Sequence, residues 1–104
     1  MRIFKCNTCS KIHLEAGNLL IHFPSVDRLK KFLDHLESID VAYYAAINRK
    51  KGLEKDIFLP VDNSTVNMAF SVSEFNELKE MIQDYLTRKE YNIPFSIELA
   101  IFQN

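Results

Sequence analysis

A Gly-Asn pair between two short apolar segments is the feature that most constrains the fold. The segment before Gly17-Asn18 alternates polar and apolar side chains, and the pair itself is typical of a two-residue β-hairpin turn. A turn of this length sets the strand register by counting, which places His13 opposite His22. We expect one face of the hairpin to be buried. The two histidines then share the other face, with Cβ atoms roughly 5 Å apart.

The same strand–strand–helix order occurs twice along the chain. A helix is predicted over residues 25–38, a second strand pair over 56–61 and 65–70, and a longer helix from the capping box Ser71-x-x-Glu74. In both helices apolar residues recur at helical spacing. The predicted core stripes are Leu29, Phe32, Leu33 and Leu36 in the first helix, and Phe75, Leu78, Met81, Ile82 and Tyr85 in the second.

Three further segments are strand-like, and together with the repeat they indicate the fold class. They cover residues 2–5, 41–47 and 94–102. We predict one α+β domain over residues 1–104, with an antiparallel sheet and two main helices on one of its faces. It is built from two strand–strand–helix repeats, about 1–39 and 40–90, and a C-terminal strand.

Composition narrows the functional classes. The chain has 104 residues, of which 47% are hydrophobic and 26% charged, and its net charge is −1. This balance gives no electrostatic case for binding nucleic acid or an anionic membrane. No apolar leader or membrane-spanning run appears. With only two cysteines, a disulfide scaffold is not expected, and a reducing cytoplasm is the expected location.

Cys6 and Cys9 form a C-x-x-C just before the predicted hairpin. The spacing lets both sulfurs converge on one ion, and the loop can fold over the hairpin face that carries His13 and His22. Zinc favours four such ligands in a tetrahedron. The sequence therefore predicts a structural zinc site built from these four residues, or the same thiols shared between two chains.

Other interpretations of the thiols stay open. A thiol redox protein could use Cys6 and Cys9, although a strand follows the motif where a redox C-x-x-C has a helix. The thiols could also be free and structurally incidental. The second repeat has no cysteine, and Ala69 stands at the position that matches His22. The repeated unit therefore does not require the motif.

A basic segment offers a separate binding hypothesis. Arg49, Lys50, Lys51 and Lys55 lie in a predicted loop close to two tyrosines, a combination found in nucleic-acid binders. A solvated loop explains the same pattern, in agreement with the sequence pI of about 6.3. No nucleophile elbow, phosphate-binding loop or zinc-protease motif is present, which argues against an enzyme.

The motif region resembles a family of small uncharacterised bacterial proteins, found mainly in Bacteroidetes. The shared features are the N-terminal C-x-x-C, a following strand that ends in Gly-Asn, and the repeated strand–strand–helix order. The resemblance covers roughly residues 4 to 88 and extends to Cys6, Cys9, Gly17 and Asn18, not to the histidines. It implies no activity.

We therefore expect a small cytoplasmic, non-enzymatic interaction or regulatory module with a zinc site. Its partner is expected to be a second copy of the chain, paired through an edge strand of the sheet. The thiol redox protein and the weak nucleic-acid binder are the alternatives.

Overall fold

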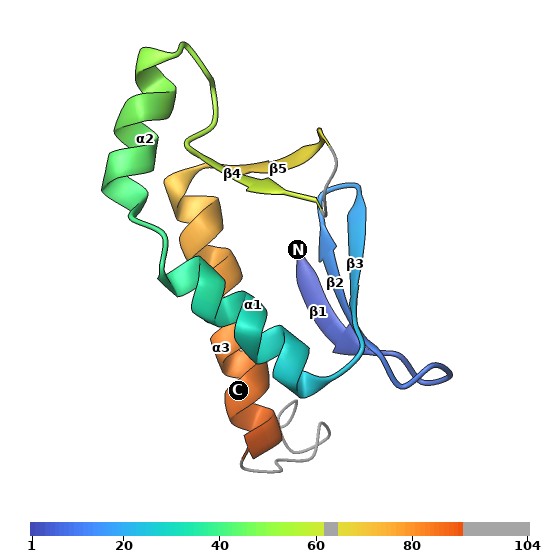
Figure 1. Ribbon diagram of the computed structural model, residues 1–104. Coiled ribbons are helices and arrows are strands. Elements are labelled where there is room, and N and C mark those ends of the chain that lie inside the picture. Colours follow the sequence, from blue (N-terminus) through green and yellow to red (C-terminus); the bar gives the residue numbers. More distant parts are fainter. Residues whose placement is uncertain (62–64, 91–104) are drawn as a thin grey trace, which may run out of the picture. The chain divides into compact units, whose positions relative to one another are not determined.

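The structure is a computed structural model that describes residues 1–61 and 65–90. The described residues form two compact units. Figure 1 labels their helices and strands. The first contains Met1–Lys31 and the described residues from Met81 onward, and the second contains Phe32–Glu80. No helix in the described part of the chain is both long and apolar enough to cross a bilayer.

A three-stranded antiparallel sheet dominates the first unit. Strands β1 (Arg2–Lys5), β2 (Ile12–Ala16) and β3 (Leu19–Phe23) lie in the order β1-β2-β3. Gly17 has a φ of 62°, and positive φ at the first turn residue alone is the pattern of a type II′ hairpin turn. The predicted register is confirmed throughout, with His13 opposite His22.

One face of this sheet is buried. The alternation along β2 directs Ile12, Leu14 and Ala16 to the same face, and all three are buried. Helix α1 (Val26–Glu37) starts in this unit, and both its position and its apolar stripe agree with the prediction. The other buried apolar side chains of the unit are Phe23, Leu29, Ile82 and Leu86.

The second unit contains a helix where the sequence predicted a strand. The strand predicted over 41–47 is wrong, because these residues belong to helix α2 (Val41–Lys50). Its valine and tyrosines favour strands, but the Asp40 carboxylate caps the helix by accepting the Tyr43 N–H at 3.2 Å. Alanines within the segment and basic residues in its last turn also favour a helix. Gly52, at a φ of 79°, ends it.

The remaining strands form a separate hairpin. Strands β4 (Ile57–Pro60) and β5 (Asn67–Phe70) pair antiparallel with each other, and helix α3 (Val72–Glu90) follows. The predicted capping box is confirmed, because Ser71 and Glu74 exchange hydrogen bonds of 2.8 and 3.1 Å. The buried apolar side chains of this unit are Leu33, Leu36, Ala45, Ile57, Leu59, Met68, Phe70, Phe75 and Leu78.

Two parts of the predicted architecture are corrected. The fold is α+β, but residues 1–61 and 65–90 form two sheets rather than one, and three helices rather than the two main helices predicted. The structure shows no clear repeat, because a strand precedes the first hairpin whereas a helix precedes the second. The strand predicted over 94–102 lies outside the described residues.

Candidate metal centre

The loop between β1 and β2 carries both cysteines. The Cys6 N–H donates to the Lys11 carbonyl at 2.8 Å, which carries the pairing of the two strands one step beyond Lys5 and Ile12. Ser10 has a φ of 58°, a left-handed conformation that is uncommon outside glycine and that helps to turn the chain back. The loop projects beyond the ends of the strands (Figure 1). The loop therefore places both thiols close to the start of β2.

Three of the four predicted ligands converge at the base of this loop. Cys9 Sγ lies 3.3 Å from His13 Nε2. Together with Cys6 Sγ, these donor atoms all lie within 4.8 Å of one another. Around a tetrahedral zinc ion such sulfur and nitrogen donors are about 3.6–3.8 Å apart, so shifts of about 1 Å would close the cluster around an ion. The arrangement therefore suits a metal bound by two thiolates and one imidazole.

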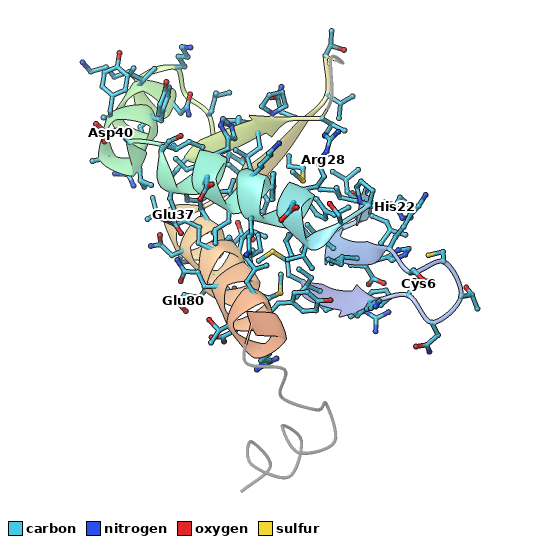
Figure 2. All side chains as sticks on the ribbon, turned by 60° about the horizontal axis from the view of Figure 1, so that its bottom comes forward. Cys6, His22, Arg28, Glu37, Asp40 and Glu80 are labelled. Carbon is cyan, nitrogen blue, oxygen red and sulfur yellow. The ribbon has the colours of Figure 1, made fainter. Side chains whose placement is uncertain are left out.

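His22, the fourth predicted ligand, lies beside this group. Its ring centroid is 4.5 Å from that of His13, with the planes at 79°, and its side chain is exposed. In residues 1–61 and 65–90, the atoms within mutual ligand reach belong to Cys6, Cys9 and His13. Figure 2 shows Cys6 on the loop, with His22 on the strand side of the site. Its role as a ligand stays a prediction.

The hydrogen bonds of the loop favour a thiolate at Cys6. The Cys9 side chain is the main cause that lowers the pKa of the Cys6 thiol to about 6, and Thr8 is the next. Thr8 Oγ1 lies 3.3 Å from Cys6 Sγ, which also accepts the Cys9 backbone N–H at 3.3 Å. This lowered pKa favours the thiolate of Cys6, which is the form that binds metals and acts as a nucleophile.

His13 is buried although it occupies the outer face of the sheet. Only 9% of its surface is exposed. The Phe4 ring stacks on it, with centroids 5.3 Å apart and planes at 14°. This contact was not predicted from the sequence. Phe4 lies in a segment that was predicted to be a strand, but the sequence did not predict how this strand pairs with β2. The loop that joins the two strands is longer than a two-residue turn, so the register cannot be obtained by counting.

The predicted basic binding residues do not form one free cluster. Arg49 and Lys50 end helix α2, so they do not lie in the predicted loop. Arg49 forms an ion pair with Asp56 at 3.3 Å, and Lys55 forms one with Glu74 at 2.7 Å. Lys50 and Lys51 are exposed. Two of the four cations are therefore engaged with carboxylates of the same unit.

The fold and this loop define a small α+β protein with a candidate metal centre of two cysteines and one histidine. Residues 2–104 match the model of a protein family of unknown function (DUF6686). The chain belongs to this family, in agreement with its resemblance to proteins without an assigned activity. No curated protein and no solved structure matches the chain significantly.

Proposed function

We propose that the protein is a small zinc-binding interaction or regulatory module without catalytic activity. The observation that carries the proposal is the convergence of Cys6 Sγ, Cys9 Sγ and a ring nitrogen of His13 within 4.8 Å. Two thiolates and one imidazole suit zinc better than magnesium or calcium, which prefer oxygen ligands. We further propose His22 as the fourth ligand, because a change of its side-chain rotamer moves the ring without altering the strand register.

The proposed role of zinc is to hold the β1–β2 loop against the outer face of the sheet. Cys9 is exposed and Cys6 is half-buried, so apolar burial alone holds this loop weakly. The core of the same unit does not use the cysteines, because Ile12 and Leu14 are buried on the opposite face of β2. We therefore expect the metal-free protein to fold, and zinc to order the loop and raise the unfolding free energy.

Elemental analysis of protein purified without chelator or added metal tests this proposal. One zinc per chain is expected, and half a zinc per chain would indicate a site shared by two chains. The variants Cys9→Ser and His13→Gln should lose the metal. His35→Gln is the matched control, because His35 is an exposed histidine on α1, outside the cluster. No zinc uptake by the wild-type chain, even after reconstitution, would refute the proposal.

Cobalt substitution tests the fourth ligand separately. Tetrahedral Co²⁺ with thiolate ligands shows charge-transfer bands in the near ultraviolet and intense visible bands that depend on the remaining ligands. His22→Ala should change the visible bands and weaken binding while the thiolate bands persist. An unchanged spectrum and affinity would leave a site with three protein ligands.

A thiol redox protein is the second candidate. The cysteine sulfurs lie within 4.8 Å of each other, and Cys9 is open to solvent. The motif lies in a hairpin loop rather than at the start of a helix, so it lacks the helix terminus that redox C-x-x-C motifs use. A reduction potential of about −270 mV, typical of thioredoxin, would support this candidate over zinc, provided that the protein also binds no metal.

Self-association through an edge strand is proposed as the mode of interaction. β1 and β3 are the outer strands of the three-stranded sheet, and such strands offer unpaired backbone groups to a second chain. Light scattering after size-exclusion chromatography should give the mass of a dimer, and a monomer at all concentrations would exclude this mode. Weak nucleic-acid binding through Arg49–Lys55 is the least supported alternative, given the ion pairs of Arg49 and Lys55.

A further inference from the structure

The outer face of the three-stranded sheet carries a row of side chains that ends at the candidate metal centre. The register pairs Arg2 with Glu15 and Phe4 with His13. Residues paired across antiparallel strands point to the same face, as do alternate residues along one strand. Arg2, Phe4, His13 and Glu15 therefore lie together on this face.

The contacts in this row hold the His13 ring from more than one side. Phe4 stacks on it with centroids 5.3 Å apart, and the His22 ring meets it nearly at a right angle. Cys9 Sγ lies 3.3 Å from Nε2. The second side-chain torsion of histidine is broad, so an unsupported imidazole samples many orientations. Stacking on Phe4 fixes the plane of the His13 ring, and Nε2 lies on the edge of that ring which faces Cys9 Sγ.

Phe4 is itself held by the next side chain in the row. The Arg2 guanidinium carbon lies 4.4 Å from the centroid of the Phe4 ring, within the range of a cation–π contact. Arg2 also donates to Glu15 Oε1 at 2.9 Å. Both members of this ion pair are well exposed, so its contribution is small compared with that of the stacked rings.

We propose that Phe4 is a positioning residue of the metal centre and that it raises zinc affinity by fixing the orientation of the His13 imidazole. This inference rests on the proposed function. Partners that orient a ligand from behind commonly change metal affinity by 10–100-fold when they are replaced. Phe4 contacts the imidazole through the face of its ring, and its side chain has no polar group that could form a conventional hydrogen bond. The lower end of that range, about tenfold, is therefore the expected effect.

The test is a competition titration of zinc against a chromophoric chelator, with the full-length wild-type chain and four variants. Phe4→Leu removes the aromatic face and should weaken zinc binding about tenfold. Phe4→Ile is a second variant that keeps a strand-favouring residue, and it should give the same result. Phe4→Tyr keeps the ring and should restore affinity. Ile3→Val is the matched control, because Ile3 lies on the same strand and points to the other face.

Denaturation of the metal-free variants separates positioning from a merely structural role. If Phe4 only stabilised β1, zinc affinity would fall in proportion to the unfolding free energy of the metal-free protein in every variant, Ile3→Val included. Positioning predicts that Phe4→Leu and Phe4→Ile lose more affinity than their stability explains, and that Phe4→Tyr regains it. In Co²⁺-loaded Phe4→Leu, changed visible bands with persistent thiolate bands are expected, because only the imidazole ligand is disturbed.

The possible results separate the positioning role of Phe4 from the zinc site on which it depends. Wild-type zinc affinity in Phe4→Leu and Phe4→Ile would overturn the positioning role and leave the zinc site in place. Affinity losses that follow stability alone, with no rescue by Phe4→Tyr, would overturn it as well. A wild-type chain that competes for no zinc would refute the metal centre itself, and the positioning role with it.

Discussion

Removal of the Asp56 carboxylate should destabilise the second unit by about 2 kcal/mol, because this side chain joins two of its helices. One carboxylate oxygen, Oδ2, accepts the Val72 N–H at 3.2 Å, at the start of α3. The other, Oδ1, accepts Arg49 Nε at 3.3 Å, at the end of α2. Only 14% of the Asp56 side chain is exposed, whereas 70% of the Arg49 side chain is.

The magnitude follows from these two contacts. An acceptor for a free N–H at a helix start contributes about 1 kcal/mol, and a negative charge there about 0.3–1 kcal/mol more. The ion pair with a largely exposed arginine adds about 0.5 kcal/mol. Asp56 makes two further hydrogen bonds, to Asn48 and Phe70, through its backbone, and these survive a substitution of the side chain.

Urea denaturation followed by circular dichroism measures the effect. Asp56→Ala should lower the unfolding free energy by about 2 kcal/mol. If that free energy falls by about 2 kcal/mol per M urea, the urea concentration at the midpoint of unfolding falls by about 1 M. Asp56→Asn keeps an oxygen for the Val72 N–H and loses the charge, so it should lose about half as much. Asp34→Ala is the matched control, since Asp34 is an exposed aspartate on α1.

Two results would refute this reasoning. A loss below about 0.5 kcal/mol in Asp56→Ala would mean that water replaces both contacts at no cost. An equal loss in Asp56→Asn and Asp56→Ala would mean that the charge, and not the hydrogen bond to Val72, is responsible.

Further predictions concern the capping box and the core. Ser71→Ala should cost about 1 kcal/mol in denaturant titrations, because the Glu74 N–H loses its acceptor. The hydrogen bond from Lys55, followed by that from the Ser71 N–H, lowers the pKa of Glu74 from 4.5 to about 2. The stabilisation by Glu74 is therefore complete above pH 4.5 and is lost as pH falls toward 2, and Glu74→Gln should flatten this part of the pH–stability curve. Leu14→Ala should cost about 2–5 kcal/mol, whereas Leu20→Ala should be nearly neutral in the same titrations, because Leu14 is fully buried and Leu20 is exposed.

Local patterns were sufficient to predict two hairpins, two helices and most of the candidate site. Gly17-Asn18 set the register that places His13 opposite His22, because a two-residue turn leaves no freedom in the count. The Ser71-x-x-Glu74 capping box marked the start of α3 because its hydrogen bonds lie within one turn. Both signals depend on residues that are close in the sequence.

Only the tertiary structure decided the features that depend on distant residues. Residues 41–47 fit a strand pattern, but they form a helix in which Ala45 is buried and Asp40 supplies the cap. The contact between Phe4 and His13 depends on how a loop longer than a tight turn closes. The sequence alone predicted which residues could bind a metal, because their types and spacing are local. Which of them come within ligand reach, and what holds His13 in place, depends on packing across strands, where side-chain orientation is not encoded by spacing.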